Sequence, residues 1–129
     1  MDMVYAVIGL ALIQYFIFGG LVGKARVQSG VEAPAVTGDP IFERHYRVHY
    51  NTLEQLIMFI PAMLMFGFYI SSMTAAILGI VFIIGRTIYF RAYVADPAKR
   101  GAGFGLSMLP IVIMLLGGVG GAIWAVVGN

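Results

Sequence analysis

Three long uncharged stretches dominate the hydrophobic pattern of the chain. They are Met3–Gly23, Gln55–Gly85 and Gly101–Asn129. A helix crosses the apolar core of a bilayer with about 20 residues, so the first and third stretches each predict one membrane span. The middle stretch is too long for one span and is interrupted near Ser71. It therefore predicts a helical hairpin.

The pattern as a whole predicts an all-α integral membrane protein, a four-helix bundle that forms a single domain over residues 1–129. We expect transmembrane helices at about 3–26, 41–70, 73–95 and 97–127. Asp39-Pro40 and Asp96-Pro97 support two of these starts, because each places an N-cap acid before a proline. The second signature predicts that Arg100 lies in the first turn of the last helix.

Composition agrees with a membrane class. Hydrophobic residues make up 60% of the 129 residues and charged residues only 11%, whereas about 25% is usual for a soluble domain. The chain has no cysteine, which excludes disulfides, a cysteine nucleophile and cysteine metal ligands. Any thiol chemistry must therefore use the thiol of a substrate.

The basic residues are confined to two regions, one around the loop after the first helix and one around the loop after the third. They are Lys24, Arg26, Arg44, Arg47, Arg86, Arg91, Lys99 and Arg100. Loops rich in lysine and arginine stay on the cytoplasmic side. We therefore expect both loops and the active site to face the cytoplasm, with both termini on the opposite side. The membrane would be the bacterial inner membrane, or the endoplasmic reticulum in a eukaryote.

Two of the predicted helices carry polar stripes. The stripe of the second helix consists of Arg44, Arg47, Asn51 and Glu54, and that of the third of Arg86, Tyr89 and Tyr93. At about 100° per residue, each set falls within a narrow sector of its helix. One alternative is a purely structural ion pair of Glu54 with Arg86 or Arg47. One carboxylate cannot balance three arginines, however, so the stripes predict a cavity for an anionic ligand.

Two motifs resemble a known family. The run Phe42–Glu54 (FERHYRVHYNTLE) resembles the second-helix motif of the MAPEG family, the membrane-associated proteins of eicosanoid and glutathione metabolism. The segment Gly85–Tyr93 (GRTIYFRAY), continuing through Pro97–Arg100 to Gly103-Phe104, resembles the junction of the third and fourth helices in that family. The nearest likeness is to type-2 microsomal glutathione transferases and cysteinyl-leukotriene synthases.

The resemblance implies a glutathione-dependent membrane enzyme. Its family fold is a homotrimer, with each site between neighbouring subunits and open to lipid. The implied activity is a glutathione S-transferase of the microsomal type, also able to act as a peroxidase, on hydrophobic electrophiles or lipid hydroperoxides. Glutathione would be the co-substrate, without a metal. The expected partners are glutathione, a hydrophobic small-molecule or lipid substrate and membrane lipid, but no nucleic acid.

Individual roles follow from the matched positions. Arg100 is the expected catalytic residue, because its counterpart in the family stabilises the glutathione thiolate. The expected glutathione-binding residues are Arg47, Asn51, Glu54, Tyr89 and Tyr93 from the family motif, Arg86 and Arg44 from the polar stripes, and His49 and Arg26 at matching polar positions. Either Lys24 or Arg26 matches the family's arginine in the first helix, because the two positions are only two residues apart. Gln55 replaces a tyrosine of the leukotriene-forming members, which leaves the lipid substrate open.

Several residues and functions lie outside this interpretation. His45 and His49 have the spacing of two ligands for one metal, but no third ligand is apparent, so no metal site is expected. Tyr46 and Tyr50 are interpreted as interfacial or packing aromatics. The alternative functions are a non-catalytic member of the same fold that binds lipid or a partner, and a small transporter that uses Glu54.

Overall fold

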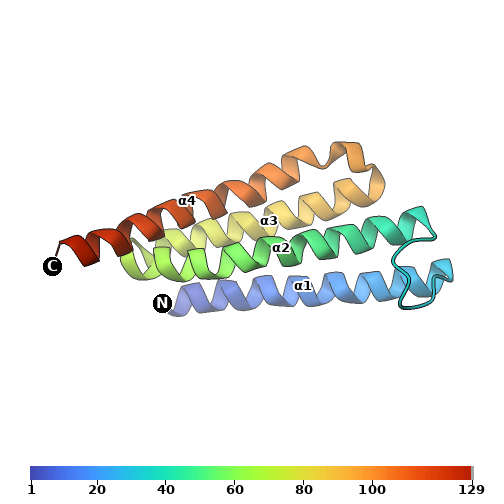
Figure 1. Ribbon diagram of the computed structural model, residues 1–129, viewed down its shortest axis with the longest axis horizontal. Helices are drawn as coiled ribbons and strands as arrows, with labels where there is room; N and C mark the ends of the chain where they lie inside the picture. The colour runs from blue at the N-terminus through green and yellow to red at the C-terminus, as the bar shows by residue number, and fades with distance from the viewer. Residues whose placement is uncertain (129) are drawn as a thin grey trace.

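The structure is a computed structural model that describes residues 1–128 of the chain. Four long helices and one short 3-10 helix follow one another: α1 (Asp2–Ser29), α2 (Pro40–Tyr69), α3 (Ser72–Ala95), η1 (Pro97–Lys99) and α4 (Gly101–Val127). The long helices lie side by side in one elongated bundle (Figure 1). The N-terminus, the α2–α3 turn and the end of α4 lie at one end of the bundle. The α1–α2 loop and the α3–α4 junction lie at the other.

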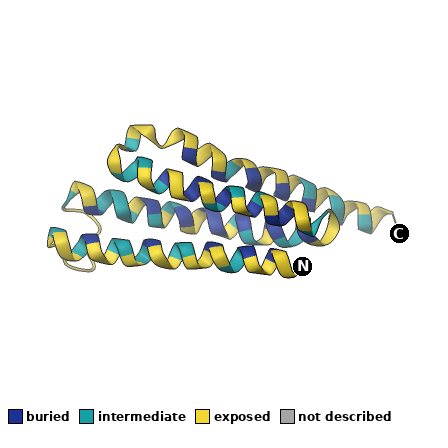
Figure 2. Ribbon diagram, turned by 180° about the vertical axis from the view of Figure 1, so that it is seen from behind, coloured by how far each residue is buried: buried dark blue, intermediate teal, exposed yellow. Residues whose placement is uncertain are grey.

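Each of the four spans is long and apolar enough to cross a membrane. Large apolar side chains cover the outside of the bundle, and Phe16 and Trp124 are 82% and 78% exposed. Buried positions lie on the inward sides of the helices (Figure 2). Such a surface suits lipid, because the exposed apolar area is far larger than the surface of a soluble domain of this size tolerates in water. The predicted all-α membrane fold is confirmed.

The start of α2 follows the predicted capping pattern. The Asp39 carboxylate accepts hydrogen bonds from the backbone N–H groups of Ile41 at 2.9 Å and Phe42 at 3.0 Å. Pro40 occupies the first turn, where its missing N–H costs nothing. The preceding helix, α1, runs on to Ser29, beyond the expected end near residue 26, and is stopped by Gly30 at a positive φ of 74°.

The start of α4 differs from the expectation. Asp96 does cap the segment, since its carboxylate accepts from the Ala98 N–H at 3.1 Å. Pro97–Lys99 then form a 3-10 turn, and α4 begins only at Gly101. The prediction that Arg100 lies in the first turn of the last helix is therefore wrong: Arg100 is the N-cap residue of α4. The reason is local, because the Arg100 N–H bonds back to the Pro97 carbonyl, while its own carbonyl accepts from Phe104.

The α2 and α3 helices form the centre of the bundle, and each packs against both α1 and α4. Phe59 and Phe82 stack in the core with ring centroids 4.0 Å apart. The closest approach is between α3 and α4. A Cβ added at Gly85 would lie 2.7 Å from the Ser107 backbone nitrogen, and one at Gly103 would overlap the backbone of Tyr89. These glycines bring the start of α4 directly against α3.

Candidate functional site

Most of the predicted site residues meet in one cleft, which we call the inner cleft. It has a volume of about 340 Å³ and is lined by Arg47, Tyr50, Asn51, Glu54, Tyr89, Tyr93, Arg100 and Phe104. Three elements form it: one face of α2, the last turns of α3 and the start of α4. The close approach of α3 and α4 brings Arg100 to the same cleft as the two tyrosines.

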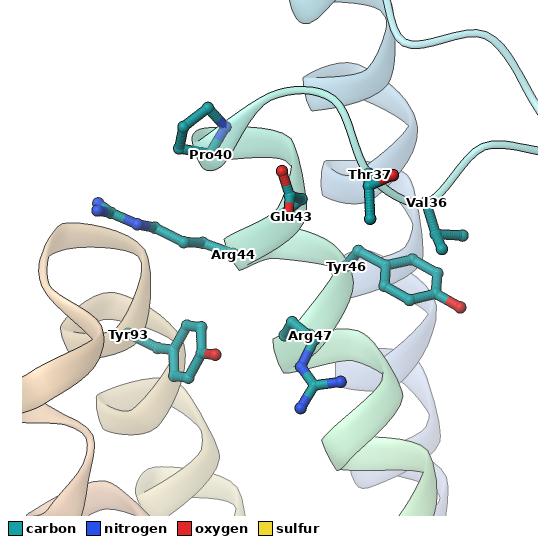
Figure 3. Close-up of a pocket in the computed structure, with 8 residues that line it drawn as sticks. All are labelled: Val36, Thr37, Pro40, Glu43, Arg44, Tyr46, Arg47 and Tyr93. Atoms are coloured by element: carbon teal, nitrogen blue, oxygen red, sulfur yellow. The ribbon is translucent and has the colours of Figure 1, made fainter.

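A second cleft, the outer cleft, lies nearer the α1–α2 loop. It has a volume of about 520 Å³ and is lined by Val36, Thr37, Pro40, Glu43, Arg44, Tyr46, Arg47 and Tyr93 (Figure 3). It shares Arg47 and Tyr93 with the inner cleft. The two clefts therefore adjoin, and the outer one lies at the loop end of the bundle.

The charges of the inner cleft are unequal. Arg47 and Arg100 supply two guanidinium groups, and Glu54 supplies one carboxylate. Arg47 and Glu54 are exposed in the single chain, and neither forms a hydrogen bond or ion pair with any residue of the described range 1–128. Arg100 donates one hydrogen bond to the Pro97 carbonyl at 2.9 Å. The cleft can therefore hold a ligand with several carboxylates and one cationic group.

Arg44 has a different role in the structure. Its guanidinium donates to the carbonyl oxygens of Val94 at 3.0 Å and Ala95 at 3.4 Å. Figure 3 shows the side chain extending from α2 toward the end of α3. Arg44 thus ties two helices together and neutralises the carbonyl end of α3, and it lines the outer cleft rather than the inner one.

Arg86 lies behind the inner cleft and does not line it. Its side chain is 0% exposed. It donates to Ser107 Oγ through Nε at 3.0 Å and through Nη2 at 2.8 Å, and to Asn51 Oδ1 through Nη1 at 2.7 Å. The guanidinium also lies 4.2 Å from the centre of the Tyr89 ring. The oxygens that accept from Arg86 are all neutral. The alternative ion pair of Arg86 with Glu54 is therefore not formed among the described residues.

His49 and Arg26 do not line the inner cleft. The His49 ring stacks on Tyr15 of α1, with centroids 4.3 Å apart. Arg26 donates to the Ala35 carbonyl at 2.7 Å and lies 4.6 Å from the centre of the Phe42 ring. Lys24 is exposed near the same end of α1. These side chains lie on the α1 side of the bundle.

The rings of the two histidines have separate partners. His45 Nδ1 lies 2.9 Å from the Ile41 carbonyl oxygen, and its ring meets Phe90 edge-on. Within residues 1–128, no group of three or more His, Cys, Asp or Glu side chains is placed to hold a metal ion.

Two residues of the inner cleft were not among the expected ligands. Tyr50, interpreted from the sequence as an interfacial aromatic, and Phe104 both line the cleft. Helical spacing could have identified them: Tyr50 lies three residues after Arg47, and Phe104 lies four residues after Arg100. They add an aromatic wall to an otherwise polar site.

Comparison with known proteins identifies the family. Residues 4–120 match the sequence profile of the MAPEG family. An uncharacterized protein of Synechocystis is 42% identical over 115 residues, which cover 89% of this chain and 84% of the relative. Human microsomal glutathione S-transferase 2 is 41% identical over 112 residues, covering 86% and 76%. Leukotriene C4 synthase of Bos taurus is 32% identical over 77 residues, covering 60% and 51%. These relatives confirm the branch that the two motifs indicated, and the chain belongs to the MAPEG family.

Proposed function

We propose that the protein is a membrane-bound glutathione transferase whose inner cleft holds glutathione. The observation that carries this proposal is that Arg47, Asn51 and Glu54 of α2, Tyr89 and Tyr93 of α3, and Arg100 at the start of α4 line one cleft. Relatives about 40% identical to the chain carry the name glutathione S-transferase.

The charges of the cleft complement those of glutathione. The tripeptide has two carboxylates and one ammonium group at neutral pH. Arg47 suits a carboxylate, because a guanidinium can donate two parallel hydrogen bonds to it. Glu54 suits the ammonium group, and the tyrosine hydroxyls can donate to or accept from peptide groups. A ligand of this kind would satisfy polar groups that are otherwise costly in a membrane protein.

Arg100 is suited to activating the thiol. A free thiol has a pKa of about 8.5, so only a few per cent is thiolate at neutral pH. A nearby guanidinium favours the thiolate and lowers that pKa. The N–H groups at the start of α4 act in the same direction. The thiolate sulfur then forms a bond to an electrophilic carbon of a hydrophobic substrate, and the leaving group departs with the electron pair of the broken bond.

We further propose that the active form is a homotrimer. Arg47, Tyr50 and Glu54 are exposed on a side of the single chain within a membrane-spanning helix. Charged groups in this position cannot face lipid without a large cost, so a neighbouring subunit would cover them. A cyclic assembly joins two different faces of the subunit, which would let Arg26 and His49 of one subunit reach the cleft of the next.

Calorimetric titration of the detergent-purified protein tests the proposal. Glutathione and an S-alkyl derivative should both bind, whereas the tripeptide without its amino group should bind much more weakly, because Glu54 would lose its partner. Turnover with an aromatic halide electrophile should yield the conjugate. A lipid hydroperoxide serves as the second substrate: two glutathione molecules would be oxidised to the disulfide as the hydroperoxide is reduced to alcohol and water. Absence of glutathione binding by a monodisperse protein would overturn the proposal.

A further inference from the structure

A buried arginine, Arg86, contacts the lining of the inner cleft from behind. It contacts two lining residues, donating to Asn51 Oδ1 at 2.7 Å and lying 4.2 Å from the centre of the Tyr89 ring. Its own side chain is 0% exposed and is absent from the lining of either cleft. It can therefore act on a ligand only through the residues in front of it.

The hydrogen bond to Asn51 fixes the direction of that amide. An arginine guanidinium has only donors, so the Asn51 atom that faces it must be the carbonyl oxygen. The NH₂ group then occupies the other branch of the amide. It makes no hydrogen bond to any residue that the structure describes, and Asn51 lines the inner cleft.

Arg86 itself is held firmly. Ser107 Oγ accepts from two of its nitrogens, at 3.0 and 2.8 Å, and in turn donates to the Gly103 carbonyl at 2.6 Å. The Nη1 group of Arg86, which bonds to Asn51, also donates to Thr52 Oγ1 at 3.4 Å. All these partners are neutral, so the positive charge polarises the amide of Asn51. Hydrogen bonds in such a chain strengthen one another.

We propose that Arg86 is a positioning residue that makes Asn51 an obligatory hydrogen-bond donor toward the inner cleft. The ligand group at Asn51 must then be an acceptor, a carbonyl or carboxylate oxygen of glutathione, and a donor group in that place is rejected. This inference rests on the proposed function for the identity of the ligand. It assigns Arg86 a role through Asn51 in place of the direct contact with glutathione that the polar stripe suggested.

A double-mutant cycle tests whether Arg86 acts through Asn51. Glutathione affinity is measured by calorimetry for the wild type, Arg86→Gln, Asn51→Ala and the double variant. A glutamine can donate or accept, so it releases the Asn51 amide, and Arg86→Gln should raise the Kd about tenfold, as expected for the loss of one hydrogen bond from a charged donor. In the Asn51→Ala background the same change should have almost no further effect. Equal losses in both backgrounds would overturn the proposal.

A rescue variant separates orientation from packing. Lysine also has only donors, so Arg86→Lys should recover part of the affinity that Arg86→Gln loses. Thr87→Val is a matched control, since Thr87 is adjacent on α3 and bonds to Gln14 of α1 instead of to this network. Its Kd should equal that of the wild type. A Thr87→Val loss as large as that of Arg86→Gln would show a general effect of altering α3 and would overturn the proposal.

A third comparison leaves Arg86 untouched. Asn51→Asp keeps the shape but presents only acceptors, so it should raise the Kd for glutathione more than Asn51→Ala does. Wild-type affinity in a monodisperse Asn51→Asp protein would overturn the assignment of Asn51 as a donor, even if the Arg86 variants fail to fold. If the wild-type chain itself binds no glutathione, the proposed function fails first, so the two failures are distinguishable.

Discussion

Arg100 combines an exposed side chain with a place in the inner cleft directly before α4. Its guanidinium can therefore approach a ligand's sulfur while its backbone caps a helix. Arg100→Ala should change glutathione affinity only a few-fold but lower turnover at neutral pH at least tenfold. Turnover falls because the pKa of the bound thiol rises toward about 8.5 when the cation is removed, which lowers the thiolate fraction at pH 7. Turnover should recover above that pKa.

A pH–rate profile of the Arg100→Ala variant, together with thiolate absorbance near 240 nm, checks this prediction. Lys99→Ala is the control, because Lys99 is also exposed and cationic but does not line the inner cleft. Activity of Arg100→Ala equal to that of the control, with an unshifted profile, would assign thiol activation to another group.

Glu54 is the only carboxylate among the described residues that line the inner cleft. Glu54→Gln keeps the shape and removes the charge, so an ammonium group bound there would lose its counter-ion. We expect glutathione binding to weaken by about 2–5 kcal/mol, the usual effect of leaving one charge of a covered pair without its partner. Calorimetric titration measures it, with Glu32→Gln in the exposed α1–α2 loop as the control. Unchanged affinity in Glu54→Gln would remove Glu54 from the site.

For individual residues, the sequence predicted which side chains gather near the cleft better than which of them line it. The stripe on α2 and the tyrosines of α3 were recognisable because helical spacing puts them on one face. Arg86 lies on the same face as Tyr89, yet only Tyr89 lines the inner cleft, and Arg86 lies behind it against Ser107. That outcome depends on how closely α4 approaches α3, a tertiary distance that spacing along one helix cannot reveal.

Among the helix contacts, that of α3 with α4 brings Arg100 and Tyr89 to the same cleft. Gly103→Ala would add a Cβ that overlaps the Tyr89 backbone, so α4 must move away from α3 and take Arg100 with it. Overpacking of this kind costs about 1–3 kcal/mol. We expect a lower thermal midpoint and a loss of turnover larger than the loss of glutathione affinity.

Gly101→Ala provides the control for this contact, because a Cβ at Gly101 would meet nothing within 4 Å. Thermal unfolding and turnover of the two variants are compared in the same detergent. If Gly103→Ala were as stable and as active as Gly101→Ala, the α3–α4 contact would not position Arg100.

The helix ends show a similar division between what the sequence reveals and what it does not. Asp39-Pro40 and Asp96-Pro97 look alike in the sequence, and both aspartates do cap the segment that follows. Only the first opens an α-helix directly; the second opens a 3-10 turn. The cap satisfies the first N–H groups in either helix type. After Asp96 the backbone bonds reach back three residues, from the Lys99 N–H to the Asp96 carbonyl and from the Arg100 N–H to the Pro97 carbonyl. After Asp39 the Glu43 N–H bonds four residues back, and the capping signature is the same in both cases.

For the whole molecule, the distribution of charge predicts the orientation in the membrane. Because the chain has no cysteine, a single introduced cysteine is the one thiol that a reagent can label. Cysteines at Glu32 and Lys99 should react with a membrane-impermeant reagent from the cytoplasmic side, and cysteines at Ser72 and Gly128 from the opposite side. Labelling of Ser72→Cys and Gly128→Cys from different sides would contradict the four-span arrangement.

Assembly is the second property of the whole molecule. The exposed charges of α2 predict that subunits associate, and the family likeness predicts three of them. Native mass spectrometry in mild detergents should show trimers. Monomers alone under every mild condition would count against a site shared between subunits.

The buried arginine of α3 also bears on how the chain enters the membrane during synthesis. Asn51 and Thr52, two of its partners, belong to a helix that is already made when α3 emerges, but Ser107 belongs to a helix that is made later. Until then α3 carries a cation with part of its hydrogen-bonding capacity unused, and an arginine at mid-helix opposes insertion by about 2.5–3.5 kcal/mol. The last two helices therefore depend on each other for stable integration, and a nascent chain that stops before Ser107 should hold α3 in the bilayer less well than one that continues through α4.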